Sequence, residues 1–291
     1  AKIKYHDNYI YDLGLIPGML YRIRNKMLEP VKPEVSEEAL KLVEELFKDE
    51  DEELRRLALE WLPLFETPPP DYKRVAMDIE VYTPVRNRVP DPVKASEPVI
   101  SVAFASNDGL RKVLLLASVN GVEREIGKCD LLEDDVELEI FDDEVAMIME
   151  AFRVIEAYPI LITFNGDNFD LRYLYNRAQR LGIPRDAVPI KPAQDSMRLN
   201  VGIHIDLYRF FENRAIQVYA FGNRYREHTL DAIASALIGY HKIALEKDIS
   251  ELNLSELAAY NFRDAKLTLE LTTFDKNLVM KLITLIMRIS R

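Results

Sequence analysis

Two acidic residues, Asp78 and Glu80, lie one residue apart inside the mostly apolar segment 75–82. On a β-strand, side chains alternate between the two faces, so both carboxylates point the same way while the apolar residues around them face the core. Carboxylates on one face repel each other unless a cation lies between them, so the pair predicts a divalent metal site. The same spacing recurs at Asp51-x-Glu53 and Asp135-x-Glu137, where a solvated surface is the simpler interpretation. The apolar setting of Asp78 and Glu80, in which unpaired charge is costly, favours the metal interpretation there.

A third acidic residue, Asp170, follows an apolar segment and a tight polar turn that begins at Asn165. We expect Asp170 in the first turn of a helix, where the helix dipole stabilises a carboxylate. Ligands of α/β folds bind at such carboxyl ends of strands, which makes Asp170 a candidate site residue. A plain helix cap is the alternative for Asp170, and Asn165 could only stabilise the turn.

The third candidate is the pair Tyr260 and Asp264, which lies in a long helical segment near the end of the chain. Residues four apart share a helix face, so this phenol and this carboxylate are predicted neighbours. The simpler alternative is a half-buried tyrosine beside a surface aspartate.

The elements that must position these residues follow from hydrophobic periodicity. Segments 73–82, 99–105, 112–117, 160–164 and 204–208 predict strands, and segments 143–157, 169–181, 230–237 and 254 onward predict helices. Gly182 is expected at the C′ position that ends the helix 169–181. Strands followed by alternating helices and strands favour an α/β domain with a mixed sheet.

The first part of the chain has a different pattern. Segment 36–47 predicts a helix capped by Ser36, and a second helix is predicted over 52–61 and stopped by Pro63. Their apolar faces are expected to be formed by Leu40, Val43, Leu46 and Phe47, and by Leu54, Leu57, Ala58 and Trp61. The proline-rich segment 66–70 predicts a stiff connector. We therefore expect two domains, 1–70 and 71–291.

Composition restricts the class of protein. The 291 residues are 48% apolar and 30% charged, with one cysteine, Cys129, which excludes a disulfide framework and a cysteine metal cluster. No uncharged apolar run is long enough to span a membrane, and an intracellular, cytoplasmic protein is expected. The net charge of −11 argues against general nucleic-acid binding. However, segment 34–60 holds 11 acidic and 4 basic residues, which leaves about −4 for the rest.

Three motifs occur in a fixed order: Asp78-x-Glu80, Asn165-x3-Phe169-Asp170 and Tyr260-x3-Asp264. They resemble the exonuclease motifs of the acidic-tetrad (DEDD) superfamily, tyrosine subclass, since Ala259 stands where the histidine subclass carries its histidine. Segments 77–82, 164–170 and 204–208 are similar to archaeal family B DNA polymerases of the crenarchaeal type. Segment 9–18 resembles the chain that leads into their 3′→5′ proofreading exonuclease domain.

The resemblance implies a ribonuclease H-like mixed sheet flanked by helices, with two divalent metal ions. In this family Asp78 would bridge both ions, Glu80 and Asp264 would complete one site, and Asp170 would support the other. Tyr260 would orient the attacking water, and the product would be a nucleoside 5′-monophosphate. Because every ligand is a hard oxygen, Mg²⁺ is expected and Mn²⁺ can substitute.

The implied substrate is the single-stranded 3′ end of DNA. Phe164, Asn165 and Phe169 are candidates to contact the terminal nucleotides, because aromatic rings stack on unpaired bases. The polymerase motifs Asp-x-x-Ser-Leu-Tyr-Pro and Tyr-Gly-Asp-Thr-Asp are absent. The chain is therefore expected to be a fragment whose partners are the palm, fingers and thumb of a full-length polymerase.

Three other polar residues have simpler interpretations. Asp206 could support the site from a second layer, although a structural hydrogen bond is the simpler role. His204 is expected to be structural, and Lys242 could contact a phosphate.

Two alternatives to the proofreading interpretation stay open. A free-standing DEDD exonuclease acting on RNA or short DNA would share the four acidic residues, and an inactive exonuclease fold could serve as an interaction scaffold. Metal-dependent nuclease activity would separate the scaffold from both enzymes.

Overall fold

The computed structural model describes residues 10–31, 33–84, 89–240 and 249–290. Lys242 lies outside these residues. The chain divides into two compact units, one formed by Ala1–Asp71 with Asp275–Arg291 and the other by Tyr72–Phe274. The division into domains 1–70 and 71–291 stays a prediction.

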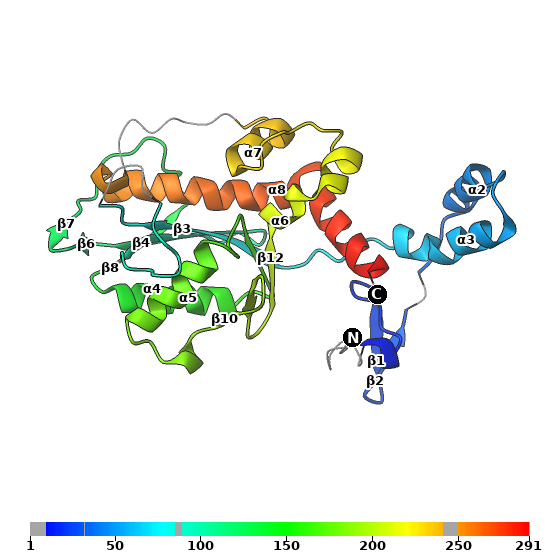
Figure 1. Ribbon diagram of the computed structural model, residues 1–291, viewed down its shortest axis with the longest axis horizontal. Coiled ribbons are helices and arrows are strands. Elements are labelled where there is room, and N and C mark those ends of the chain that lie inside the picture. Colours follow the sequence, from blue (N-terminus) through cyan, green and yellow to red (C-terminus); the bar gives the residue numbers. More distant parts are fainter. Residues whose placement is uncertain (1–9, 32, 85–88, 241–248, 291) are drawn as a thin grey trace. The chain divides into compact units, whose positions relative to one another are not determined.

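The larger unit contains most of the secondary structure (Figure 1). Its strands are β3 Arg74–Val81, β4 Val99–Ser106, β5 Arg111–Leu116, β6 Ser118–Val119, β7 Val122–Glu123, β8 Glu137–Phe141, β9 Ile160–Thr163, β10 Ile190–Pro192, β11 Met197–Leu199 and β12 Ile203–Asp206. Its helices are α4 Glu144–Glu156, α5 Asp170–Arg180, η1 Arg185–Ala187, α6 Leu207–Glu212, η2 Ile216–Ala220, α7 Leu230–Ile238, η3 Ile249–Glu251 and the first part of α8 Leu254–Ile289.

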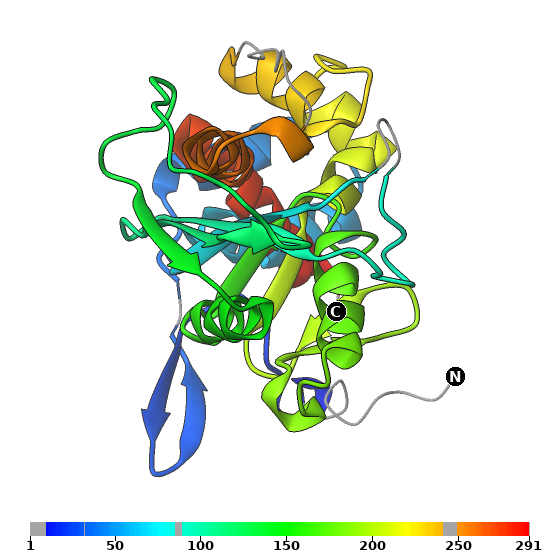
Figure 2. The same ribbon diagram turned by 90° about the vertical axis from the view of Figure 1, so that its left-hand side faces the viewer.

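The core of this unit is a six-stranded sheet in the order β12-β9-β3-β4-β5-β8. Strands β12, β9 and β3 run parallel to one another, β4 is antiparallel to both β3 and β5, and β8 is parallel to β5. Helix α8 covers one face and helices α4 and α5 cover the other (Figures 1 and 2). The predicted α/β fold with a mixed sheet flanked by helices is confirmed.

The sequence explains the central strands and the helices beneath them. All eight residues of β4 are buried, as expected for a strand covered on both faces. Helix α4 begins where the Asp143 carboxylate accepts the Ala146 N–H, and helix α5 ends at Gly182, whose φ of +75° suits the left-handed C′ position. The predicted strand over 204–208 is too long. The Asp206 carboxylate accepts the Tyr208 N–H at 3.0 Å and thereby starts helix α6.

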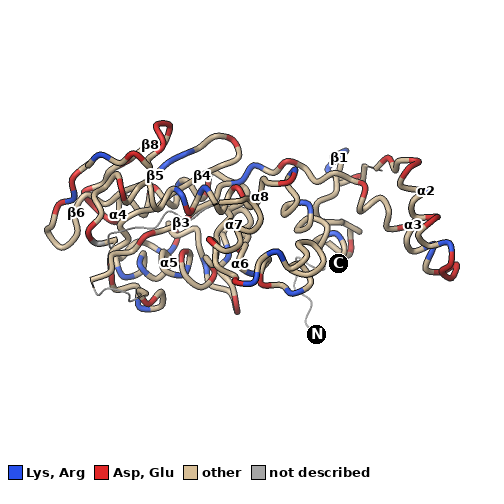
Figure 3. The backbone as a smooth tube through the Cα atoms, turned by 90° about the horizontal axis from the view of Figure 1, so that it is seen from above, with Lys and Arg blue, Asp and Glu red and all other residues tan. Residues whose placement is uncertain are grey.

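The smaller unit holds the hairpin strands β1 Tyr21–Arg24 and β2 Met27–Pro30, the helices α2 Glu37–Leu46 and α3 Glu52–Glu66, and the end of α8. Buried Arg288 ties this unit together by donating to the carbonyl oxygens of Leu64, Thr67 and Gly18. Acidic residues are frequent along α2, α3 and the turn between them (Figure 3).

Two predictions for these helices are wrong. Pro63 lies inside α3, which continues to Glu66, because the Pro63 carbonyl still accepts the Thr67 N–H and the helix loses only one donor. The predicted inward faces are also wrong. Helix α2 buries no residue, and the buried residues of α3 are Leu62 and Leu64. The expected core residues are partly or largely exposed, with Leu46 at 66%.

Helix α8 passes through left-handed backbone at Asp275, Lys276 and Asn277, where the two units divide. No helix among the described residues is both long and apolar enough to cross a membrane.

Candidate metal centre

Three carboxylates meet at the carboxyl half of β3. Oxygen atoms of Asp78, Glu80 and Asp264 all lie within 4.8 Å of one another, and each side chain is half-buried. Met77, Ile79 and Val81 are buried as the alternation on a strand predicts. The sheet and helix α8 thus bring together residues almost two hundred positions apart.

The strand register fixes where these carboxylates point. Asp78 pairs with Ala103 of β4 and Glu80 pairs with Ser101, and the register shifts between Glu80 and Val81. Such a shift marks a β-bulge or a similar irregularity, and β-bulges are frequent beside active sites because they redirect side chains. Glu80 is the last residue before this irregularity.

Asn261 of α8 makes hydrogen bonds to Asp78 of β3 and to Ser101 of β4. Its side-chain N–H donates to Asp78 Oδ2 at 2.7 Å, and its Oδ1 accepts the Ser101 hydroxyl at 2.7 Å. Asn261 and Ser101 are fully buried, so the two bonds fix the amide orientation and hold Asp78 in one position. No role for Asn261 was predicted from the sequence. The signal that could have found it is an amide on a buried helix face between Tyr260 and Asp264.

Asp170 lies beside the same cluster. It is buried at the start of α5, and its Oδ1 accepts the N–H of Ile79, the residue between the two β3 carboxylates, at 3.2 Å. Its carboxylate is therefore not a helix cap. The N-cap residue of α5 is Phe169, which makes no side-chain capping bond.

Asp206 holds the turn that delivers Asp170. Its carboxylate accepts the N–H of Asn165 at 2.7 Å and that of Asp167 at 3.0 Å. Asn165 has a φ of +70°, and a Cβ at Gly166 would lie 2.2 Å from Thr163 Oγ1, so the close turn requires glycine there. These contacts give Asp206 a structural role in the turn.

His204 belongs to the support of the same turn. Its Nε2 lies 2.8 Å from Thr163 Oγ1 and its Nδ1 lies 3.1 Å from the Met197 carbonyl oxygen. Burial lowers the pKa of His204, which favours the neutral ring. These contacts agree with the expectation that His204 is structural.

The cluster is electrostatically strained. Burial raises the pKa values of Asp78 and Glu80 well above their usual range, and the charges of the neighbouring carboxylates raise them further. Burial also raises the pKa of Asp170, to about 7, while the hydrogen bond from Ile79 opposes this rise. A bound cation would offset both the burial of these carboxylates and the repulsion between their charges.

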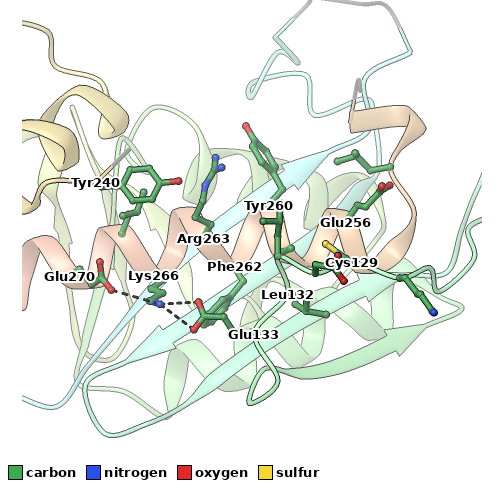
Figure 4. A pocket seen from close by; sticks show the side chains of 16 residues that line it. Cys129, Leu132, Glu133, Tyr240, Glu256, Tyr260, Phe262, Arg263, Lys266 and Glu270 are labelled. Carbon is green, nitrogen blue, oxygen red and sulfur yellow. Dashed lines mark hydrogen bonds and ion pairs between the residues drawn. The ribbon is translucent and has the colours of Figure 1, made fainter. Parts of the chain in front are cut away.

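Tyr260 lines a pocket of about 630 Å³ (Figure 4). Burial raises the pKa of Tyr260, and the charges of Glu80 and Asp264 contribute. The Arg263 guanidinium lies 5.1 Å from the Tyr260 ring centre, and its Nε lies 3.3 Å from Asp264 Oδ1. The phenol is therefore a protonated hydroxyl next to the carboxylates.

The three candidate substrate residues flank the Asp206-bound turn. The half-buried Phe164 ring contacts Tyr208 edge-on at 6.1 Å, and the Phe169 ring lies 5.7 Å from Tyr173. The Asn165 side-chain oxygen accepts a bond from Asn168. A role for these residues in substrate binding stays a prediction.

The donor set fits divalent cations. Three carboxylates with mutually close oxygens, and a fourth bonded to the strand between them, provide hard oxygen ligands of the kind that Mg²⁺ and Mn²⁺ take. Among the residues that the structure describes, no cysteine or histidine belongs to the cluster, and a set of carboxylates alone is unlike the nitrogen and sulfur ligands typical of zinc.

The sequence was also compared with protein families and with curated proteins. Residues 1–233 match the family model described as DNA polymerase family B, exonuclease domain. The whole chain is 46% identical to DNA polymerase 1 of Sulfolobus acidocaldarius and 47% identical to those of Saccharolobus solfataricus and Aeropyrum pernix. It covers 33%, 32% and 30% of those proteins, respectively. The chain thus spans about a third of the length of these three relatives.

Proposed function

The chain belongs to the exonuclease-domain family of the family B DNA polymerases, and from this premise we propose that it removes nucleotides from the 3′ end of single-stranded DNA. The product is a nucleoside 5′-monophosphate. The observation that carries the proposal is the convergence of Asp78, Glu80 and Asp264 within 4.8 Å, with Asp170 bonded to the strand between the first two.

The four carboxylates divide the work of holding two cations. Asp78, Glu80 and Asp264 would hold one ion, and Asp170 together with Asp78 would hold the other. When bound, the two ions supply an activated water and stabilise the leaving 3′-oxygen. We take Mg²⁺ as the natural ion, with Mn²⁺ as a substitute, because the ligands are all carboxylate oxygens.

Residues around the four carboxylates position the reacting groups and the substrate. Tyr260 keeps its proton at neutral pH and donates a hydrogen bond that orients the attacking water. Asn261 holds Asp78 in place, and Asp206 holds the turn that carries Asp170. Phe164 and Phe169, at the two ends of that turn, stack on the unpaired terminal bases, with Asn165 between them.

We also propose that this activity serves a longer polymerase. The relatives of similar sequence are named DNA polymerase 1 and are about three times as long as this chain. The palm, fingers and thumb would then lie in the remainder of the full-length protein, and this chain would incorporate no nucleotides.

The test is a strand-degradation assay. The chain is incubated with Mg²⁺ and a 3′-labelled single DNA strand, with parallel samples of labelled duplex DNA, labelled RNA and EDTA. We expect labelled mononucleotides from the single DNA strand, slower release from the duplex, and none with EDTA. Faster degradation of RNA would favour the alternative of an RNA exonuclease, and no release from any substrate would favour an inactive scaffold.

A further inference from the structure

A second pocket of the larger unit, distinct from the carboxylate cluster, has a lining that contains no acidic residue. It measures about 400 Å³ and is lined by Arg214, Gln217, Asn223, Tyr225 and Arg226. In a chain with a net charge of −11, two guanidinium groups around one cavity are unusual. Basic residues also gather along the chain that follows α6 (Figure 3). This charge is the opposite of that of the metal centre.

The floor of this pocket is rigid. Gln217 is 5% exposed, and its side-chain N–H donates to the Tyr225 carbonyl oxygen at 2.9 Å. The Tyr225 hydroxyl donates to the Phe211 carbonyl oxygen at 2.9 Å, and the Phe211, Phe221 and Tyr225 rings pack with centres 5.7 to 6.0 Å apart. Left-handed backbone at Gly222 and Asn223 returns the chain towards η2. The floor is thus built before any ligand arrives.

The rim presents two guanidinium groups, and a hydrogen bond holds that of Arg214. Gln217 Oε1 accepts a hydrogen bond from Arg214 at 3.0 Å, which orients that guanidinium over the pocket. Within the described part of the chain, no acidic side chain forms an ion pair with Arg214 or Arg226. Two like charges held around one cavity repel each other, and an anion between them removes the repulsion. A guanidinium group matches a phosphate group with two parallel hydrogen bonds.

The position of the pocket connects it with the metal centre. Strands β9 and β12 are parallel neighbours, so the turn after β9 and helix α6 after β12 start at the same edge of the sheet. Asp206, the last residue of β12, holds that turn, and the pocket begins two residues beyond the end of α6. Tyr219 of η2, within the same segment, is 88% exposed. Proteins that bind single strands combine cationic grooves with exposed aromatic rings in this way.

We propose that Arg214 and Arg226 bind the phosphodiester backbone of the single DNA strand whose 3′ end enters the metal centre. The inference rests on the proposed function for its choice of ligand. The contact is independent of metal ions and supplies local attraction that an acidic chain otherwise lacks. A pocket built for an acidic peptide would use the same guanidinium groups, and the test separates the two.

The test measures binding without hydrolysis. A fluorescent oligothymidylate of about 20 nucleotides is titrated with the chain in EDTA, over a series of NaCl concentrations, so that failure of the exonuclease activity cannot affect the result. The logarithm of the binding constant falls with the logarithm of salt by about 0.7 for each phosphate contact to a single strand. The double variant Arg214→Gln, Arg226→Gln should therefore lower this slope by about 1.4 and bind more weakly at low salt.

The single variant Arg226→Gln should lower the slope by about 0.7, and Arg224→Gln is its matched control. Arg224 belongs to the same exposed segment and donates to the Ala236 carbonyl oxygen outside the pocket. Its substitution by glutamine removes the same charge. We expect it to keep the wild-type slope. If the double variant does not fold, Arg226→Glu serves instead, because Arg226 is exposed on the rim. An unchanged slope in the pocket variants, or an equal loss in Arg224→Gln, would overturn the proposal and leave an acidic peptide as the ligand to test.

Discussion

The chain carries the pattern Asp-x-Glu in two strand-associated places with opposite surroundings. Asp135 and Glu137 are more than 60% exposed, and each pairs with a basic residue: Asp135 with Arg111 at 3.0 Å and Glu137 with Lys112 at 3.2 Å. Arg111 also pairs with Glu133, and Lys112 also pairs with Glu139 and Glu150. At Asp78 and Glu80 the neighbours are two further carboxylates and the side chains are half-buried. The same spacing thus gives exposed carboxylates in ion pairs in one place and a cluster of neighbouring carboxylates with an excess of negative charge in the other. What distinguishes a metal site is the charge that remains uncompensated.

The largest expected effect comes from removing a carboxylate of the buried cluster. Asp78→Ala and Asp170→Ala should each reduce Mg²⁺-dependent strand degradation to background, because each removes a cation ligand. Without metal, each variant relieves repulsion between the carboxylates but leaves one buried N–H donor without its acceptor, so its melting temperature should stay near that of the wild type. Asp135→Ala is the matched control and should keep full activity. Near wild-type activity of either cluster variant, with unchanged melting, would show that the ligands are assigned wrongly.

Tyr260→Phe should have the next largest effect. Losing one positioning hydrogen bond costs about 1–3 kcal/mol, a factor of roughly ten to a hundred in rate. The ring of phenylalanine keeps the packing against Arg263, so metal affinity and stability should change little. The comparison is the single-turnover rate at saturating Mg²⁺ against that of Asp264→Ala, which should be far slower. A rate equal to that of the wild type would make Tyr260 a packing residue only.

Asn261→Ala tests the support of the cluster. It leaves Asp78 without its buried hydrogen-bond donor, and loss of such support typically weakens metal binding by roughly 10–100-fold. Thr268→Ala, at another buried polar position of α8, is the control and should keep the wild-type metal affinity. Both are compared by Mn²⁺ titration alongside melting curves. An equal loss in the two variants would reduce the effect of Asn261 to general helix stability.

The smallest expected effect is on stability as a function of pH. Burial raises the pKa of Asp170 to about 7, so the folded, metal-free chain holds protons that the unfolded chain releases near pH 4. This contribution to stability is present at low pH and is lost as the pH rises through about 7. In EDTA, the drop in melting temperature between about pH 5 and pH 8 should be smaller for Asp170→Asn than for the wild type. Mg²⁺ should also reduce the wild-type drop. Equal drops in the variant and the wild type would show that Asp170 titrates normally.

The sequence predicted the sheet and its three motif positions because these depend on local patterns. Alternation around Asp78 and the apolar run of β4 report burial directly. Asp170 could be placed in a first helical turn, but its bond to Ile79, 91 residues away, could not be predicted from spacing. The same limit applies to Asp206, whose partners lie in another strand-to-helix turn, and to Asn261.

The predictions failed where helix geometry depends on what a helix packs against. A proline normally ends a helix, but α3 continues past Pro63 because the next turn keeps its own hydrogen bond at Thr67. The apolar residues of α2 were expected to be buried because of their spacing. Periodicity defines a face but does not identify the surface that covers it, and α2 buries no residue. The basic pocket was missed for a similar reason, since Arg214 and Arg226 are separated by a turn in left-handed backbone.

The most direct test of the account is the number of divalent ions that the chain binds. Isothermal titration with Mn²⁺ should give two ions for the wild type and for Asp135→Asn, because the exposed Asp135 and Glu137 already form ion pairs with Arg111 and Lys112. Asp78→Asn should lose at least one ion, since Asp78 is proposed to contact both. Absence of binding to the wild type, or the same loss in Asp135→Asn as in Asp78→Asn, would contradict the claim that the buried cluster is the metal centre.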